Sequence, residues 1–354
     1  MRLEQLQPGD TGEIIDFLRT AFQADRDAPF LAPATIQWKY FTPRPEWIGS
    51  RSYVYRDGGQ IVAHGCAVPI TLPLADGDVR LISVVDWAAA ASIRGIGRSL
   101  ISDLTALVDA RLAFGGSTMG RQLLHRSKLS APFSSWRRGF RIIRPSRLRP
   151  ASASKVMISA LRWTRDCARL ATLPFARHGE WRATVVPRFD ATLPDAARAN
   201  GRSDFALPLR TPALLNYMLD CPAARVRGYL LTWRGRPRGH LLLFCVDRQV
   251  RVGDLQLDSD LEDDWKDCFA LAVRVARKDF PEASTVSADA FAPAIEQALR
   301  RAGYRLGPPQ QCRAQDPGAR LHPSRLPALG MIDNDTAWLE SASPSQPSFS
   351  LSTK

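Results

Sequence analysis

Apolar residues recur along the chain with two different periods, which predict an alternation of helices and strands. Helical spacing joins Ile14 to Phe22 and also marks residues 34–41. Strand-like runs follow at residues 52–56, 60–64 and 79–85, and the turn Asp57-Gly58-Gly59 predicts a hairpin between the first two. Two glycines then lead into a helix whose apolar stripe is expected to continue from Leu100 to Leu112. The order of these elements predicts an α/β (α+β) chain with a mixed, mostly antiparallel, twisted sheet flanked by helices.

The second half of the chain repeats this order. Strands are expected at 228–233, 240–246, 250–257 and 285–288, with helices at 261–278 and 291–301. Asn334 and Asp335 are expected to form the turn of a final hairpin. Each half closes on a Gly-aromatic-Arg phrase, 139–141 and 303–305. The repetition indicates a diverged internal duplication. The predicted domains are 1–145, a basic linker with a helix at 146–184, a second domain at 185–340, and a disordered Ser/Pro-rich tail at 341–354.

The net charge of +13 is concentrated in one part of the chain. Residues 121–182 carry 15 basic and 2 acidic side chains, whereas the blocks before and after them are close to neutral. Such a strip is expected to line a site for a phosphate-bearing small molecule beside the glycine turn at Gly95 and Gly97, and peripheral contact with a membrane is also possible. Because no platform of alternating aromatic and basic residues accompanies it, nucleic acid is an unlikely partner.

The cysteines, histidines and apolar runs restrict the class of protein further. The six cysteines are scattered without paired spacing, which disfavours a disulfide framework and a zinc site, and no metal is expected. The longest apolar runs fall far below the roughly 20 residues of a membrane-spanning helix. Because the first residues also contain no apolar signal core, a cytoplasmic location is expected.

The most informative stretch runs from Val84 to Leu100. A strand ends at Asp86-Trp87, a turn contains Gly95 and Gly97, and a helix begins. Backbone N–H groups at such a turn converge on one point, where a helix N-terminus adds roughly half a positive charge. With Arg94 and Arg98 beside it, the turn predicts a pyrophosphate cradle. A dinucleotide fingerprint does not fit, because position 100 is leucine and a hairpin precedes the turn.

The order of elements and the phrase Ser92-Ile93-Arg94-Gly95-Ile96-Gly97 resemble the GNAT acyltransferase family, in which a turn of this form binds the pyrophosphate of acetyl-CoA. The phrase Trp136 to Phe140 resembles a second family segment, in which Ser135 stands where the family usually has a tyrosine that protonates the thiolate. The resemblance implies two tandem GNAT-like domains, also similar to FemAB-like proteins. It implies acetyl-CoA contacts from Trp87, Ala88, Ile93, Arg94, Gly95, Ile96, Gly97, Arg98 and Ser99.

Asp86, His64 and Ser135 are the candidates for catalysis on this reading, with Ser134 as the alternative to Ser135. Asp86 or His64 would take the proton of the attacking amine, and Ser134 or Ser135 would return a proton through water. The second copy has acidic residues from Asp258 to Asp264 where the cradle would lie, so it is not expected to bind CoA there.

The expected function is acetyl-CoA-dependent N-acyl transfer to an amine of a small molecule or of a cell-envelope or polysaccharide precursor. Two alternatives are a FemAB-like aminoacyl transfer, in which tRNA would be a partner, and a non-catalytic CoA-binding or scaffold protein.

Overall fold

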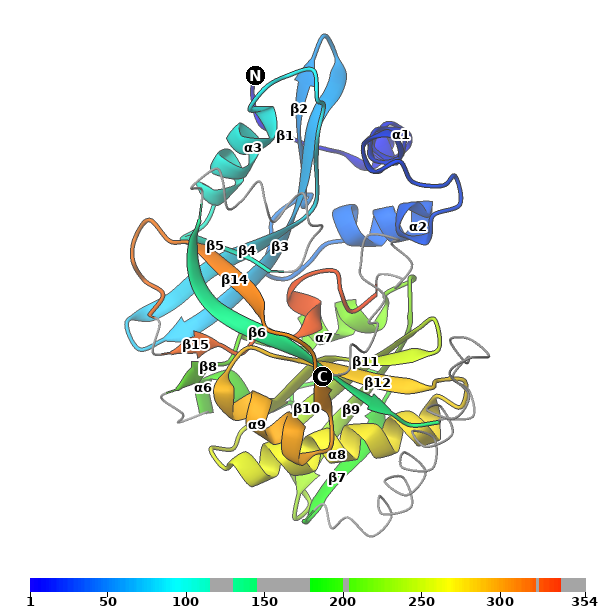
Figure 1. Cartoon of the computed structure of the whole chain (residues 1–354), viewed down its shortest axis with the longest axis vertical. Helices are drawn as coiled ribbons and strands as arrows, with labels where there is room; N and C mark the ends of the chain where they lie inside the picture. The colour runs from blue at the N-terminus through cyan, green and yellow to red at the C-terminus, as the bar shows by residue number, and fades with distance from the viewer. Residues whose placement is uncertain (115–129, 145–178, 200–203, 323–324, 339–354) are drawn as a thin grey trace.

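The computed structural model describes residues 1–114, 130–144, 179–199, 204–322 and 325–338. Within them, thirteen strands form one mixed sheet that runs through the whole molecule, with helices on both faces (Figure 1). This agrees with the predicted mixed α/β class. No helix in the described ranges is long and apolar enough to cross a membrane.

The first half begins with short helical elements and an antiparallel meander. Its helical elements are α1 (Thr11–Phe22), α2 (Pro33–Ile36), the π-helix η3 (Gln37–Phe41) and α3 (Ile96–Thr105). Its strands are β1 (Glu4–Gln5), β2 (Ser52–Asp57), β3 (Gln60–Leu74), β4 (Gly77–Ala89) and β5 (Ala110–Ala113). Helices α1 and α2 pack on one face of this sheet through Ile14, Leu18 and Ile36, and α3 packs on the other face through Leu100 and Leu104.

Two sequence predictions for this half were wrong in extent. The run 60–64 is only the start of β3, which continues to Leu74 and pairs with β4 along its length. The stripe from Leu100 to Leu112 is not one helix. Helix α3 ends at Thr105, Leu107 is 38% exposed, and Leu112 lies in β5, which pairs in parallel with β4. Burial in the sheet therefore outweighs a helical spacing that those residues share by chance.

The second half repeats the meander and adds its own helices. Its strands are β7 (Trp181–Val186), β8 (Phe205–Ala206), β9 (Arg225–Trp233), β10 (Arg236–Val246), β11 (Gln249–Leu257), β12 (Thr285–Ala290), β13 (Arg305–Leu306), β14 (Gln310–Gln315) and β15 (Leu326–Pro327). Its helical elements are α6 (Ala196–Ala199), α7 (Pro212–Leu219), α8 (Glu262–Asp279), α9 (Pro293–Arg301) and the 3-10 turn η7 (Met331–Asp333). The predicted strands and the two long helices are all present.

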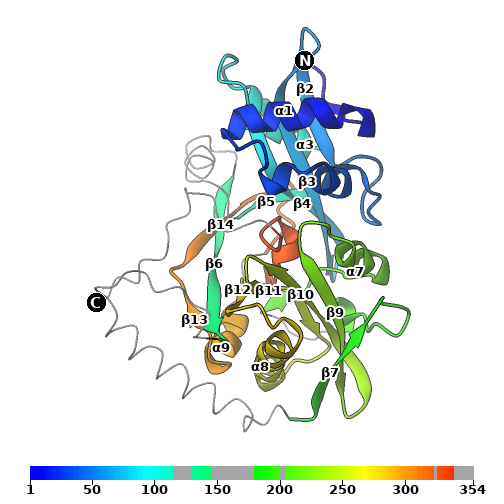
Figure 2. The ribbon, with the colours of Figure 1, turned by 90° about the vertical axis from the view of Figure 1, so that its right-hand side faces the viewer.

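Each half lends a strand to the other. β6 (Ala131–Ile142) pairs with β12, β13 and β14, all from the second half of the chain. β14 in turn pairs with β5 of the first half and with β6. The strand order is therefore β1-β2-β3-β4-β5-β14-β6-β12-β11-β10-β9-β7, with β13 paired to β6 beside this path. Figure 2 shows β14 and β6 running from the part of the molecule with α1 and α3 to the part with α8 and α9.

The end of the described chain differs from its sequence prediction. Asn334 and Asp335 were expected to form the turn of a final hairpin, but β15 pairs in parallel with β8 instead. The Asn334 side chain accepts hydrogen bonds from the N–H and hydroxyl of Thr336, at 2.7 Å each. The turn prediction holds locally, but no partner strand follows it within the described residues. The predicted linker helix and the tail from Ser341 lie outside those residues.

Candidate active site

A β-bulge in β4 forms the centre of the candidate site. Val85 pairs with Cys66 and Ala88 pairs with His64, so two residues of β4, Asp86 and Trp87, oppose Gly65 alone. Asp86 has a φ of 50°, a left-handed conformation that is strained for residues other than glycine, although aspartate and asparagine adopt it more often than most. Bulges concentrate next to active sites because they turn a strand's side chain and peptide groups out of the regular ladder.

The side chain of Asp86 is held by two consecutive residues of the π-helix. Lys39 forms an ion pair with its carboxylate, and the Tyr40 hydroxyl donates to Oδ2 at 2.6 Å. The side chains of Lys39 and Asp86 are only 3% and 7% exposed. Burial acts to raise the pKa of Asp86, but the Lys39 charge and both hydrogen bonds lower it below its ordinary value. Asp86 is therefore a weakly basic carboxylate in the folded chain.

His64 holds the other side of the same residue. Its Nδ1 lies 2.9 Å from the carbonyl oxygen of Asp86, and its Nε2 lies 2.8 Å from the Ser52 hydroxyl. A carbonyl oxygen can only accept, so Nδ1 carries the proton and Nε2 accepts from Ser52. Burial lowers the pKa of His64 to about 4, which keeps the ring neutral at pH 7. Because His64 is fully buried and both nitrogens are engaged, its observed role is to fix the bulge.

The turn after β4 has the form predicted for an anion cradle. Gly95 has a φ of 84°, and a Cβ there would meet only open space. Helix α3 begins at Ile96, and the N–H groups of Arg94, Gly95 and Gly97 have no hydrogen-bond partner among the described residues. The side chains of Arg94, Arg98 and Ser99 are exposed around them, whereas Ile93 packs partly against the core and Ile96 is buried.

Gly97 serves helix packing as well as the turn. A Cβ at this position would lie 3.1 Å from Cβ of Ala89 and 3.2 Å from Nε1 of Trp87. That indole nitrogen donates to the Gly97 carbonyl at 3.2 Å, so Trp87 ties the start of α3 to the end of β4. Ala88 is buried and lies within the β3–β4 ladder.

Ser135 lies apart from this group. It is an exposed residue of β6 that pairs with Gln311 of β14. In the sheet order, β5 and β14 separate β6 from β4, which corresponds to about 14 Å at the usual strand spacing. No contact in the described chain joins Ser135 to Asp86 or His64.

The start of α8 differs chemically from the start of α3. Ser259 bonds to the carboxylate of Asp264, and Trp181 Nε1 donates to the same carboxylate at 2.8 Å. Arg301 pairs with Glu262 and Asp263. The chain's own carboxylates therefore supply the negative charge that a helix N-terminus favours.

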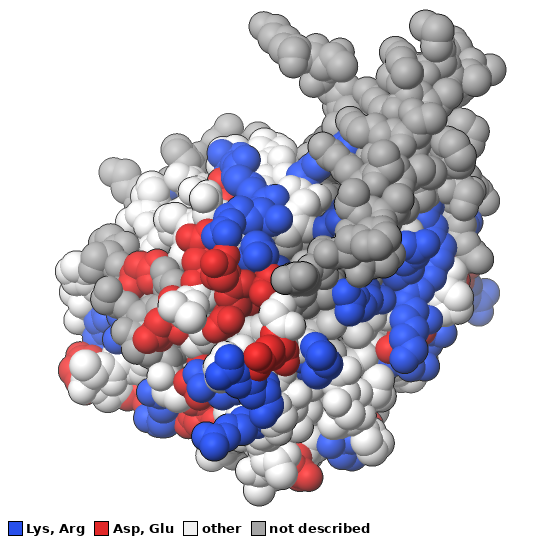
Figure 3. Space-filling model, turned by 90° about the horizontal axis from the view of Figure 1, so that it is seen from below, with Lys and Arg blue, Asp and Glu red and all other residues white. Residues whose placement is uncertain are grey.

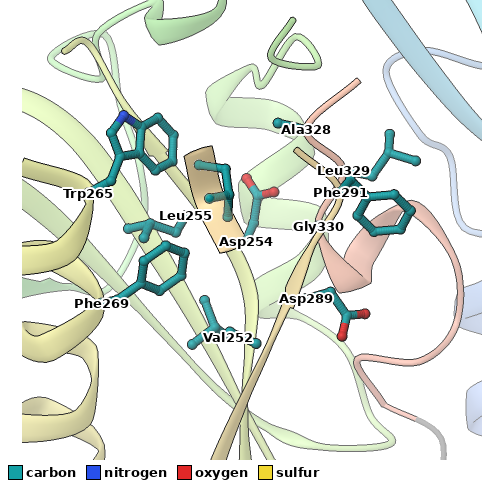
Figure 4. A pocket seen from close by; sticks show the side chains of 12 residues that line it. Val252, Asp254, Leu255, Trp265, Phe269, Asp289, Phe291, Ala328, Leu329 and Gly330 are labelled. Carbon is teal, nitrogen blue, oxygen red and sulfur yellow. The ribbon is translucent and has the colours of Figure 1, made fainter. Parts of the chain in front are cut away.

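Next to this helix, strands β11 and β12 pair only from Gln249 to Arg251 and then diverge. The opening encloses about 30 Å³, room for one or two water molecules. Trp265 and Phe269 of α8 line one side of it, and Phe291 and Leu329 line the other (Figure 4). The side chains of Asp254 and Asp289 also line the opening, so its lining is both apolar and acidic.

A second buried ionic group lies beside that opening. Arg210 binds Asp254 through Nε and Nη2 at 3.0 and 3.1 Å, and it binds Asp333 at 2.6 Å. His240 Nε2 lies 2.7 Å from Asp254. Burial opposes ionisation, but Arg210 and His240 lower the pKa of Asp254 to about 2. Each half therefore has a histidine and an aspartate on two paired neighbouring strands: His64 on β3 and Asp86 on β4, and His240 on β10 and Asp254 on β11.

Sequence reasoning found Asp86 and His64 but missed three of their neighbours. Lys39 and Tyr40 lie in an apolar segment, and Asp335, whose pKa burial and the charge of Asp86 raise, follows Asp86 by 249 residues in the chain. A signal was available for Lys39, because it is one of only six lysines in an arginine-rich chain and is surrounded by Ile36, Trp38 and Tyr40. A lone cation in such a run requires a buried counter-charge. No comparable signal marks Asp335.

The described arginines of the basic strip between residues 137 and 144 contact the second half rather than the turn, and Arg182 donates to the Trp181 carbonyl at 3.0 Å. Arg137 pairs with Glu296, and Arg138 forms two bonds to Asp289 at 2.7 and 2.8 Å. Arg141 and Arg144 donate to backbone carbonyls between residues 277 and 302. The expectation that the strip lines the turn was wrong for the four arginines between residues 137 and 144. The other basic residues of the strip from Arg121 to Arg177 lie outside the described residues. Basic and acidic side chains are also intermixed on the lower face of the molecule (Figure 3).

Comparison with known proteins identifies the fold. No family model and no curated protein matches the sequence. Two GCN5-related N-acetyltransferases match in structure with TM-scores of 0.53. The one from Anabaena variabilis is 9% identical, over 88% of this chain and 72% of its own, and the one from Kribbella flavida is 13% identical, over 88% and 71%. A candidate acetyltransferase from Pyrococcus horikoshii also reaches 0.53, with 10% identity over 94% and 95%. The chain therefore has the fold of the GCN5-related N-acetyltransferases.

Proposed function

We propose that the protein is an acyl-CoA-dependent N-acyltransferase, with acetyl-CoA as the first donor to test, and that its first half holds the donor. The observation that carries the proposal is the turn before α3. This turn follows the bulged strand β4. It has two exposed arginines, and its N–H groups at Arg94, Gly95 and Gly97 have no partner in the part of the chain that the structure describes.

The donor fits this turn by charge and by space. A pyrophosphate would accept from the free N–H groups, and Arg94 and Arg98 would add full positive charges. The open space beside Gly95 lets a ligand approach the backbone closely. Acyl-CoA would supply an activated thioester, and the bulge at Asp86 and Trp87 would present a peptide N–H outside the ladder to the thioester oxygen.

The same reasoning argues against a second donor site at α8. Glu262, Asp263 and Asp264 lie in the first turn of that helix, so a pyrophosphate would meet negative charge. We therefore propose one donor site for each chain, with an amine of a small molecule or of a cell-envelope or polysaccharide precursor as the acceptor.

Calorimetric titration with acetyl-CoA tests this proposal. The double variant Arg94→Glu/Arg98→Glu reverses two exposed charges without touching the core, and affinity should fall by at least tenfold. The matched control is Arg26→Glu, an exposed arginine beyond α1. Gly97→Glu is a poorer test because its side chain would collide with Trp87 and Ala89.

Three results would count against this assignment: no binding by the wild type, equal binding by the double variant, or an equal loss in the Arg26 control. Binding without thioester consumption across a panel of amines would instead favour the non-catalytic alternative.

A further inference from the structure

The π-helix η3 belongs to the first half, but the side chain of its Trp38 lies in the core of the second half. The indole is 4% exposed and packs in one cluster with residues of α7, β10 and η7. No other member of that cluster within the described ranges comes from the first half. The second half therefore holds one end of η3 in a fixed position.

Tyr217 of α7 and Trp38 are joined by three contacts. Their rings are stacked, with centroids 4.8 Å apart and an interplanar angle of 11°. The indole Nε1 donates to the Tyr217 carbonyl at 3.1 Å, and the Tyr217 hydroxyl donates to the Trp38 carbonyl at 2.9 Å. Because hydrogen bonds are directional, this pair in opposite directions fixes both the distance and the orientation between α7 and η3.

Arg51 extends this contact along the end of η3. Its Nη2 donates to the Tyr217 hydroxyl at 2.7 Å and to the Trp38 carbonyl at 2.9 Å. The same guanidinium also donates to the carbonyls of Lys39 and Thr42. The last carbonyls of a helix have no partner within the helix, and buried ones need another donor. Since Arg51 forms no ion pair with a described carboxylate, these carbonyls and the Tyr217 hydroxyl hold its buried charge.

The other end of this path is the bulge of β4. Lys39 and Tyr40 follow Trp38 directly in η3, and both hold the Asp86 carboxylate. Each step from Tyr217 to Asp86 is thus a hydrogen bond, an ion pair or a covalent neighbour. Rare π-helical turns of this kind are frequent at functional sites.

We propose that Tyr217 is a positioning residue for the acyl-transfer site of the first half. It acts through Arg51 and η3 on the bulge at Asp86. This inference rests on the proposed function, in which the bulge presents a peptide N–H to the thioester oxygen. A shift of η3 would displace that donor, and a misplacement of about 1 Å can lower a rate about 100-fold. The donor turn lies with α3 on the opposite face of the sheet, so binding of acetyl-CoA should not depend on Tyr217.

Steady-state kinetics of Tyr217→Phe test this role. The variant keeps the stacked ring but loses the hydroxyl, and with it the hydrogen bonds to Arg51 and to the Trp38 carbonyl. With glucosamine, lysine and spermidine as acceptors, kcat should fall about tenfold or more at a temperature where the variant is fully folded. The Kd for acetyl-CoA, measured by calorimetry, should stay within about twofold of the wild-type value.

The matched control is Tyr229→Phe, the same substitution at another tyrosine of the second half. The Tyr229 hydroxyl donates to Asp279 at 2.7 Å, and its ring packs in the cluster around α8. This variant should lower stability but leave kcat unchanged. A Tyr217→Phe enzyme with wild-type kcat, or an equal loss of kcat in both variants, would overturn the inference.

A double substitution tests the path through Arg51. Arg51→Lys keeps the positive charge but has a single nitrogen, which cannot replace the planar fork of the guanidinium. If both residues act through one path, Tyr217→Phe/Arg51→Lys should lose little more kcat than Arg51→Lys alone. Losses that multiply would show that the two residues act separately, and would contradict this path.

A second readout does not depend on turnover. In protein labelled with ¹⁵N-tryptophan, the backbone N–H signal that is absent from Trp87→Phe reports on the bulge. Tyr217→Phe should shift this signal by more than its line width, whereas Tyr229→Phe should not. An unshifted signal in Tyr217→Phe would overturn the inference. Failure of the wild type to bind acetyl-CoA would instead overturn the proposed function, whatever happens to this signal.

Discussion

Asp86 is held both at its carboxylate and at its backbone carbonyl. Lys39 and Tyr40 hold its carboxylate, while His64 holds its carbonyl in the left-handed conformation of the bulge. Strained backbone of this kind costs on the order of 1–3 kcal/mol and persists only where the surroundings over-determine it. The Ser52–His64 hydrogen bond lies on the side of the imidazole away from Asp86, so a substitution at Ser52 removes it without changing Asp86.

Ser52→Ala should therefore destabilise the fold by about 1–3 kcal/mol, because it leaves the buried Nε2 of His64 without a donor. Urea unfolding measures this change. Ser102→Ala, at an exposed position of α3, is the control and should stay within about 0.5 kcal/mol. A similar small effect at Ser52 would mean that the bulge does not depend on this chain of hydrogen bonds.

Stability should also depend on pH through Asp335. Its pKa is raised to about 7 in the folded chain, from an ordinary value of 3.8. Between these values the folded chain holds a proton that the unfolded chain has lost, so this contribution to stability falls as pH rises from about 4 to 7, by up to about 1.4 kcal/mol per unit. Asp335→Asn should remove that fall, and its stability relative to the wild type should increase across the window.

His64 gives the opposite slope and allows the two residues to be separated. Its pKa is lowered to about 4 from 6.5, so its contribution to stability is lost as pH falls from 6.5 towards 4. The contribution of His64 is the same in Asp335→Asn and in the wild type, so it cancels in the difference between their free energies of unfolding. If that difference stays constant from pH 4 to 7, the pKa of Asp335 is not raised in the folded chain.

At the scale of elements, the contact of α3 with β4 depends on one glycine. Gly97→Ala would place a methyl group within 3.2 Å of Ala89 and Trp87, which should push the helix away from the strand. We expect a loss of about 1–3 kcal/mol, as for other overpacked sites, together with weaker binding of acetyl-CoA.

Gly95→Ala is the informative comparison, because its Cβ would meet no atom but its φ of 84° would strain alanine. It should cost about 1 kcal/mol. Differential scanning calorimetry of the two variants separates collision from strain. A Gly97→Ala protein as stable as the wild type would show that α3 can shift at no cost.

The sequence predicted local elements well where a single physical cause acts. The strands and helices of the second half, the hairpin at Asp57–Gly59 and the turn at Gly95 all follow from periodicity and turn chemistry. The end of α3 at Thr105 does not, because the burial of Leu112 in the sheet decides it. The group of Lys39, Asp86 and Asp335 also escaped prediction, since it joins three distant segments and only the fold brings them together.

At the scale of the whole molecule, the exchanged strands couple the two halves. β5 pairs with β14 and β12 pairs with β6, so each half completes its sheet with residues from the other. A chain ending at residue 308 lacks β14 and the segment that carries Asp333 and Asp335. Thermal unfolding of this shortened chain should show no cooperative transition, because even the first half lacks the strand that pairs with β5.

A chain ending at residue 338 is the control, because the Ser/Pro-rich residues beyond it have the composition of a segment without a core of its own. Its thermal transition should match that of the full chain. A stable, cooperative fragment ending at 308 would show that the first half closes its sheet without β14.

The exchange of strands also sets a condition on synthesis. As the polypeptide leaves the ribosome, residues 1–114 emerge with β5 open along the edge that β14 later occupies, and about 200 further residues must be translated before Gln310–Gln315 arrives. At 5–20 residues per second this interval lasts roughly 10–40 seconds. During that time the nascent chain presents an unpaired strand edge, a known site of aggregation. Production of the protein should therefore be sensitive to translation speed and to chaperone supply.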